Sequence, residues 1–113
     1  MTNIKFPNVA VIPLLNKEFK AQPNGIIVVC GIGRSLISYS TYIAIKPHDQ
    51  DVAYIRDDWR DFSNTTSRHT ATFVSNQIGV DVTPADLRAI QDGKRTNPRI
   101  QFKTPAELEE GSA

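Results

Sequence analysis

The chain has 113 residues, of which 40% are hydrophobic and 22% charged, and a formal net charge of +1 at pH 7. This size predicts one domain with its own core, and the near-neutral charge gives no overall indication of a nucleic-acid or membrane partner. The single cysteine, Cys30, excludes an intrachain disulfide and a cysteine-based zinc site. No apolar stretch approaches the ~20 residues of a membrane-spanning helix, and the N-terminus lacks a secretory pattern.

The first half of the chain is predicted to form strands. Residues 8–15 give a weak strand that Pro13 places at a sheet edge. Residues 25–32 are mostly apolar at both odd and even positions, which is typical of a strand buried on both faces. Residues 35–47 alternate, and residues 51–56 form a further strand after a polar turn. The link between 25–32 and 35–47 is short and contains glycine, so these two strands are expected to form a hairpin.

The second half is predicted to form helices. Residues 65–78 place Thr, His, Phe and aliphatic side chains at helical spacing on one side, and Gly79 is a typical C-terminal stop. Thr83 is the predicted N-cap of a second helix, with a proline and an aspartate in its first turn. Residues 99–104 are a candidate closing strand, and residues 105–113 a short terminal helix or an acidic tail.

Strands followed by helices predict an α+β domain. We expect an antiparallel β-sheet of three to five strands, arranged as hairpins or a meander, packed against two helices on one face. The single domain is expected to span residues 1–104, with the acidic tail over residues 105–113.

A run of polar side chains surrounds the start of the first predicted helix. Ser63, Thr65 and Thr66 precede His69, although one capping hydroxyl is enough to begin a helix. In one interpretation, a partly buried His69 points towards the sheet and is held by the threonine hydroxyls. In another, these four residues and the free N–H groups of the helix start bind a phosphate or carboxylate. Catalysis by His69 is the weakest of the three hypotheses.

Aromatic and basic residues provide a candidate surface for a partner. Trp59 could stack on a base or anchor a protein interface. The basic residues that we expect to pair with acidic or phosphate groups beside it are Arg60, Arg68, Lys94, Arg95 and Arg99.

Two segments resemble a known family. SYSTYIA at residues 38–44 is followed by W-x-x-F-S-x-T-T-x-x-H at residues 59–69. This order resembles a family of small, uncharacterised domains carried largely by bacteriophages, which share a Ser-Tyr-x-Thr-x-Ile/Val-Ala strand and an aromatic-Ser-x-Thr-Thr-x-x-His helix start. The resemblance covers about residues 35–79, and Phe62 stands where tyrosine is common. It implies a phage context, in which small accessory proteins often bind and block a host factor, including defence nucleases.

Other motifs give weaker predictions. CGIGRS at residues 30–35 lacks the third glycine of a dinucleotide-binding loop and precedes a strand, so it is interpreted as a hairpin turn. Asp57, Asp58 and Asp61 lack the spacing of a calcium loop, so no metal site is expected.

A helix-turn-helix is a more serious alternative. Residues 73–98 resemble the second half of a phage-repressor motif, in which residues 83–91 would enter the major groove while Lys94, Arg95 and Arg99 hold phosphates. An ordinary helix pair with a basic, solvent-facing exit explains the same pattern.

We therefore expect a non-enzymatic, phage-type accessory protein in the host cytoplasm, with no cofactor, no metal and no catalytic residue. Its expected partner is a host protein or ribonucleoprotein defence complex, which it blocks by steric and electrostatic contact, in the manner of an anti-CRISPR protein. The alternatives are a DNA-binding regulator that uses residues 79–99, and a binder of a small phosphate ligand or nucleotide at the start of the 65–78 helix. A membrane partner is not expected, nucleic acid is a further candidate partner, and self-association to a homodimer is left open.

Overall fold

The computed structural model describes residues 10–111 of the chain, with side chains as far as Glu109. Asn8 and Val9, the first two residues of the strand expected over 8–15, lie outside the described residues. None of the helices within the described part of the chain has the length and apolarity to cross a membrane.

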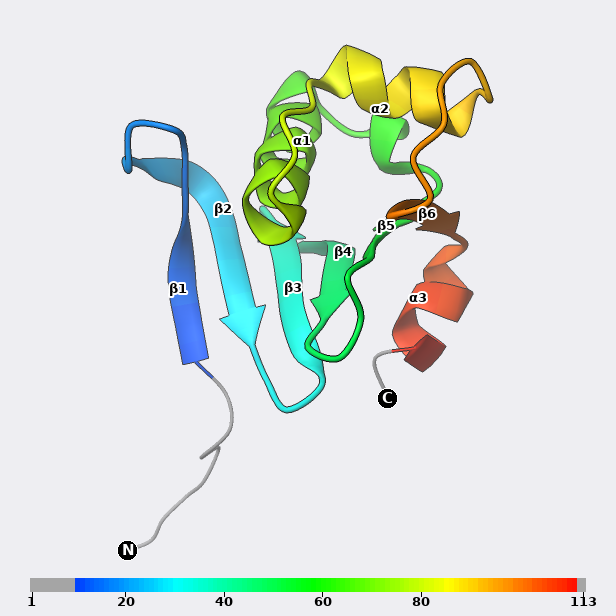
Figure 1. Ribbon diagram of the computed structural model, residues 1–113. Coiled ribbons are helices and arrows are strands. Elements are labelled where there is room, and N and C mark those ends of the chain that lie inside the picture. Colours follow the sequence, from blue (N-terminus) through cyan, green and yellow to red (C-terminus); the bar gives the residue numbers. More distant parts are fainter. Residues whose placement is uncertain (1–9, 112–113) are drawn as a thin grey trace, which may run out of the picture.

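Six strands form one sheet in which neighbours in space are also neighbours in sequence (Figure 1). The first five are antiparallel to one another, and the last pairs parallel with the fifth. Together with the helices this confirms the predicted α+β class, although the sheet is mixed and not purely antiparallel. The strands are β1 (Ala10–Leu15), β2 (Ala21–Val29), β3 (Gly33–Ser38), β4 (Thr41–Pro47), β5 (Ala53–Arg56) and β6 (Ile100–Lys103).

The sheet has one strand more than expected because residues 35–47 form two strands, not one. The chain turns at Tyr39 and Ser40, between β3 and β4. Tyr39 has a φ of +58°, in the left-handed region, and its N–H donates to the carbonyl of Asn24 at 2.7 Å. A turn of this kind usually contains glycine, and its absence made the segment look continuous.

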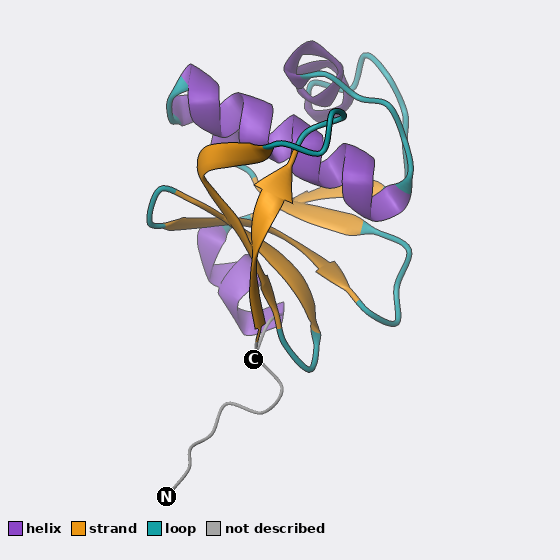
Figure 2. Ribbon diagram, turned by 90° about the vertical axis from the view of Figure 1, so that its left-hand side faces the viewer, coloured by secondary structure: helices purple, strands orange, loops and turns teal. Residues whose placement is uncertain are grey.

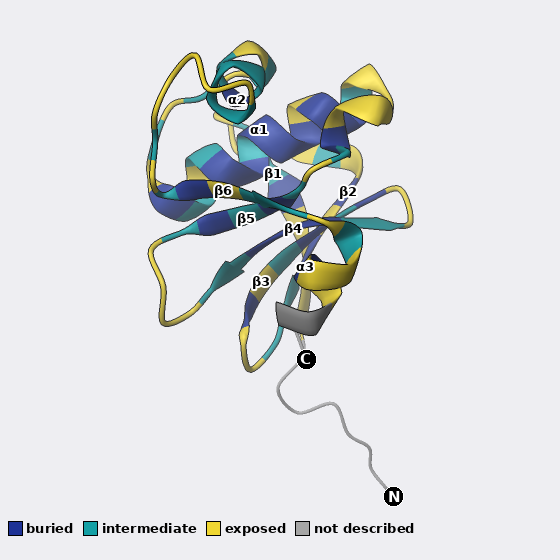
Figure 3. Ribbon diagram, turned by 90° about the vertical axis from the view of Figure 1, so that its right-hand side faces the viewer, coloured by how far each residue is buried: buried dark blue, intermediate teal, exposed yellow. Residues whose placement is uncertain are grey.

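Two helices cover one face of the sheet, as predicted. Helix α1 spans Asn64–Ile78 and helix α2 spans Pro84–Gln91, after a short 3-10 helix, η1, at Trp59–Asp61. Figures 2 and 3 show α1 and α2 on one side of the sheet and the third helix, α3 (Pro105–Gly111), on the other. The face towards α1 and α2 is called the helix face below, and the opposite one the outer face.

The core lies between the helix face and α1, where Figure 3 shows the buried segments of both. It includes strand residues and the apolar stripe of α1, which the spacing over 65–78 predicted. Its largest fully buried members are Trp59, Phe73, Leu14, Leu36, Ile43, Ile55, Leu87 and Val74.

The C-terminal segment belongs to the domain instead of forming a separate tail. Thr104 and Glu107 cap the start of α3 through reciprocal hydrogen bonds of 2.9 and 3.1 Å. Leu108 is 3% exposed and lies beside Ile45 on the outer face. The domain therefore continues past the boundary expected at residue 104, while residues 112–113 lie outside the described part.

Candidate functional site

The start of α1 forms a chain of hydroxyls that leads into the interior. Ser63 is the N-cap, and its side chain accepts the N–H of Thr66 at 3.2 Å. The Thr66 hydroxyl lies 2.9 Å from the Ser38 hydroxyl of β3, which lies 2.9 Å from Nδ1 of His69. Ser38, Thr66 and His69 are all buried, at 1%, 3% and 2% exposure.

The ring of His69 is held by the Ser38 hydroxyl, and either group can donate the proton of that hydrogen bond, depending on the tautomer of the ring. Burial lowers the pKa of His69 below its ordinary value of 6.5, the Pro23 carbonyl raises it, and the nearby charge of Arg68 lowers it further.

This arrangement confirms that His69 is buried and points towards the sheet. The expected contact with threonine hydroxyls is wrong, because the hydroxyl that bonds the ring belongs to Ser38, and Thr66 bonds Ser38 in turn. The four residues of the hypothetical anion site do not share an open surface. Thr66 and His69 are enclosed, Ser63 is exposed, and half-buried Thr65 accepts a hydrogen bond from Arg68 at 3.3 Å. The cluster therefore joins α1 to β3 and is closed to a ligand in this conformation.

The buried histidine predicts a stability that falls in acid. A lowered pKa in the folded state means that the unfolded chain binds the proton more readily, so this contribution is complete above pH ~6.5 and is lost as pH falls through the folded pKa. We expect His69→Gln to lower the free energy of unfolding by about 1–3 kcal/mol at pH 7.5, because buried partners lose their hydrogen bonds. The variant should also have a flatter stability profile between about pH 7.5 and pH 5.

Urea unfolding across this pH range measures the effect. His48 provides the matched control because it is the other histidine and is exposed, with Nε2 2.8 Å from the carbonyl of Cys30. The His69→Gln profile should be flatter than the His48→Gln profile. A His69→Gln profile as steep as that of the wild type would contradict the assignment.

Trp59 is a core residue, so its expected role as a contact for a partner is wrong. Its side chain is 0% exposed, and its indole N–H donates to Oε1 of Gln91 at 3.0 Å. The Gln91 amide in turn donates to the carbonyl of Asp57 at 2.7 Å. Trp59 thus fixes η1 against the end of α2 and leaves no ring face open for stacking.

Most of the arginines expected to bind a partner are paired within the chain. Arg60 lies 2.8 Å from Asp92, and Arg95 pairs with Asp86. Arg99 binds Asp51 at 2.7 Å and the carbonyl of Ile78 at 2.6 Å. Internal pairing of this kind leaves less charge available for phosphates or acidic groups.

These basic residues also do not form one surface. Arg68 is near the start of α1, whereas Arg99 contacts the carbonyl of Ile78 at its end. Ten residues of helix separate the two positions, which is about 15 Å. Lys94 is exposed in the loop after α2 and forms no ion pair with any residue whose side chain the structure describes.

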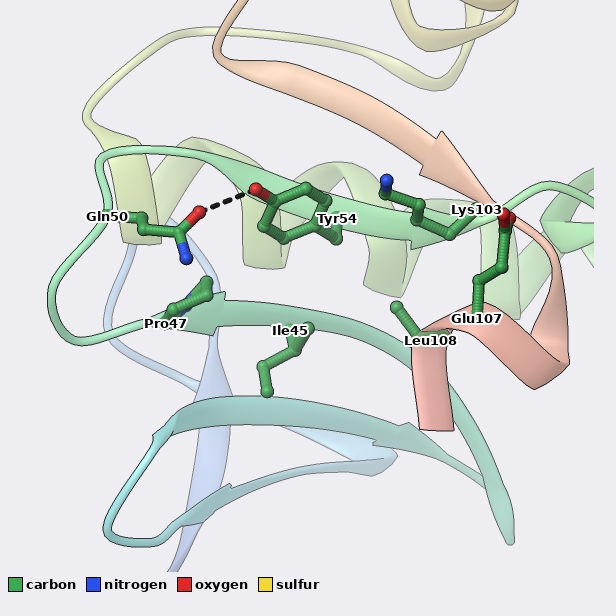
Figure 4. Close-up of a pocket in the computed structure, with 7 residues that line it drawn as sticks. All are labelled: Ile45, Pro47, Gln50, Tyr54, Lys103, Glu107 and Leu108. Carbon is green, nitrogen blue, oxygen red and sulfur yellow. Dashed lines mark hydrogen bonds between the residues drawn. The ribbon is translucent and has the colours of Figure 1, made fainter. Parts of the chain in front are cut away.

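A half-open cavity of about 430 Å³ lies between α3 and the outer face (Figure 4). Ile45, Pro47 and Leu108 are its apolar lining. Tyr54 lies between two polar groups, since its hydroxyl donates to Gln50 at 2.5 Å and its ring centroid is 5.5 Å from the Lys103 ammonium. Glu107 brings a carboxylate to the same cavity, so the opposite charges of Lys103 and Glu107 favour no particular class of ligand.

The structure reveals one exposed residue that the sequence analysis missed. Phe19 is 84% exposed at the tip of the β1–β2 hairpin, the highest exposure among the large apolar side chains of residues 10–109. Its φ is +62°, in the left-handed region that favours glycine. The available signal was an aromatic residue inside the charged loop NKEFK, at the turn position where glycine is usual.

Comparisons with known proteins give a family but no function. Neither the curated proteins nor the solved structures include a match to this chain. The model of a family of unknown function, DUF8033, matches residues 13–88, which run from β1 into α2. This span is more than half of the chain and includes both the hairpin tip and the buried histidine cluster. The chain therefore belongs to the family of unknown function DUF8033.

Proposed function

We propose that this protein acts by binding another protein and that Phe19 at the β1–β2 hairpin tip is the main contact. The observation that carries the proposal is an exposed aromatic side chain on a strained backbone. A left-handed conformation costs a residue with a side chain about 1–2 kcal/mol. Strain of this kind persists where the surroundings enforce it and is concentrated at functional sites.

Hydrogen bonds within the loop hold Phe19 in this conformation. The side chain of Asn16 accepts the N–H groups of Glu18 and Lys20 at 2.8 and 3.1 Å. The backbone of Asn16 also accepts the N–H of Phe19 at 2.9 Å and donates to the carbonyl of Lys20 at 3.0 Å. The tip is therefore ordered before any partner arrives, which reduces the entropy lost on binding.

The hairpin is also attached to the helix layer. Asn76 of α1 donates to the carbonyl of Leu15 at 2.9 Å, and Lys17 lies 3.0 Å from Asp81 in the α1–α2 loop. Large aromatic residues carry much of the binding energy in protein interfaces when they enter a pocket of the partner. A rigid platform with one projecting phenylalanine suits this mode of contact.

The partner that we propose is a host defence complex, which the protein would block sterically. Support comes from the resemblance of residues 35–79 to small phage-borne domains, which implies an accessory protein that acts on a host factor. Phe19 takes the anchoring role first expected for Trp59. The DNA-binding alternative over residues 79–99 stays a prediction, and the internal pairing of Arg95 and Arg99 with acids makes it the less favoured of the two.

Phe19→Gly should separate stability from binding. Glycine relieves the left-handed strain, so the free energy of unfolding is expected to rise by up to about 1 kcal/mol. Loss of the aromatic ring should weaken partner binding by tenfold or more, or about 1.4 kcal/mol. Thermal unfolding measures the first effect. Affinity capture from defence-bearing bacteria, together with protection of an infecting phage, measures the second.

Tyr39→Gly is the matched control. Tyr39 is also an exposed aromatic residue with positive φ, 53% exposed at +58°. Unlike Phe19, its ring lies beside another ring of the fold, with its centroid 6.3 Å from that of His69. Its glycine variant should keep the partner and the protection. If Phe19→Gly captures the same partner in the same amount as the wild type, the hairpin tip is not the contact. If the wild type gives neither a stoichiometric partner nor protection, the proposed role in defence is wrong.

A further inference from the structure

The outer face of β1 to β4 contains no charged side chain. Strand pairing places Val11 opposite Val28, and Ile26 opposite Ile37. Directly opposed residues point to the same side of a sheet. Continuing this register across β4 places these further paired residues on the outer face with them: Pro13, Gly33, Ser35, Tyr42, Ile45 and Pro47.

The charges of these strands lie on the other face. Arg34 pairs with Lys46 in the register of β3 and β4, on the side where Arg34 reaches Gln77 of α1. An antiparallel sheet with one solvated face usually has polar residues on that face. In β3 and β4 the charged residues instead lie on the helix face, and the outer face carries none. This indicates that another surface covers the outer face.

Helix α3 covers only part of this surface. It contacts β5 and β6, and its Leu108 lies beside Ile45 of β4. Towards β1 the apolar side chains are open, with Val11 61% and Ile26 37% exposed. The apolar pattern of residues 25–32 predicted a strand buried on both faces. Ile27 on the helix face is 4% exposed, whereas Ile26 on the outer face is 37% exposed, so the prediction is wrong for the outer face.

We propose that a second copy of this chain packs its outer face against this one, sheet on sheet, around a two-fold axis. In a two-fold interface the same patch is present on both sides, so a patch with charges of one sign would bring that sign into the interface twice. An uncharged apolar face avoids this repulsion and is complementary to itself. Pairing of two β1 edges is a poorer alternative, because Pro13 has no N–H to donate to an added strand.

The size of the patch determines the strength of the dimer. Four strands about 4.8 Å apart, with two or three outward residues each, give a face of only a few hundred Å² per copy. Stable complexes bury about 800 Å² per partner. The dimer should therefore be weak and reversible and should form only at high protein concentration. This inference is independent of the proposed function, since Phe19 lies at the hairpin tip and not in the patch.

Sedimentation velocity of the full chain between about 5 and 500 µM tests the proposal. The wild type should shift from monomer to dimer across this range. Ile26→Lys should raise the dissociation constant by at least tenfold, because it places two like charges in the interface. Ile12→Lys is the matched control, since Ile12 has a similar exposure of 41% but pairs with Ile27 on the helix face.

Each result of this experiment either supports or contradicts a dimer formed through the outer face. Loss of the dimer in Ile26→Lys alone, with unchanged thermal unfolding of both variants, supports it. A wild type that stays monomeric at every concentration overturns it, as does a dimer that both variants weaken equally. The wild type could instead stay monomeric and capture a host protein that the Ile26→Lys variant no longer binds. That result would show that the outer face binds the host protein, and it would overturn self-association.

Discussion

Replacing Trp59 with alanine is expected to lower the free energy of unfolding by about 3–5 kcal/mol, the usual cost of removing a large aromatic side chain from a core. The indole is 0% exposed and belongs to the core cluster that joins the sheet to α1 and α2. Its removal leaves a cavity in a layer that cannot collapse without moving η1. The loss would take away a large fraction of the stability of a domain of this size.

Two milder variants divide this effect into its parts. Trp59→Phe keeps most of the apolar contact and removes the hydrogen bond to Gln91, so a loss of about 1–2 kcal/mol is expected. Gln91→Ala leaves the indole N–H without its partner and should cost about 1–3 kcal/mol. Urea unfolding monitored by circular dichroism measures all three variants without relying on tryptophan fluorescence.

Phe62→Ala is the control for an aromatic residue of the same segment. Phe62 is 38% exposed, and the guanidinium of Arg56 lies 5.3 Å from its ring centroid. Its truncation should cost less than about 1 kcal/mol. Equal losses for Trp59→Ala and Phe62→Ala would contradict the burial of Trp59. The result also affects binding studies, because a Trp59 variant would lose a partner through unfolding and not through a missing contact.

Local signals in the sequence predicted the helices well. Thr83 caps α2 and forms reciprocal hydrogen bonds of 3.0 and 3.1 Å with Asp86, as the Thr-Pro start implied. Gly79 ends α1 with a φ of +68° and donates its N–H to Ser75. Pro13 marks β1 as an edge strand, which the sheet order confirms. In each case the determining interactions lie within a few residues of one another.

Features that depend on distant residues were not predictable in this way. The parallel register of β5 and β6 joins Ala53 to Ile100 across two helices, and no local pattern specifies that partner. The burial of Trp59 depends on Gln91, 32 positions away. Phe19 differs from a core phenylalanine only in its exposure to solvent. Exposure depends on how the whole chain folds, so it could not be predicted from nearby residues. The fold class expected from the sequence is therefore the one observed, whereas the proposed contact for a partner is Phe19 at the hairpin tip and not Trp59.

The glycines of CGIGRS give the second large prediction, through close packing and not through phosphate binding. A Cβ added at Gly33 would lie 2.5 Å from the carbonyl oxygen of Lys46 and 2.8 Å from Cα of Pro47. Both contacts are with the backbone of β4, which cannot rotate away as a side chain would. Gly33→Ala must therefore push β3 and β4 apart at the residues that open their pairing.

We expect Gly33→Ala to lower the free energy of unfolding by about 1–3 kcal/mol or more, the range for overpacking a rigid site. Gly31→Ala provides the control within the same turn, because a Cβ there meets nothing within 4 Å. Its stability should stay within about 0.5 kcal/mol of the wild type, or rise slightly because alanine restricts the unfolded chain. Urea unfolding of the pair distinguishes the explanations. A requirement for close strand packing affects Gly33 alone, whereas a loop selected for flexibility or anion binding would make both substitutions costly or neither.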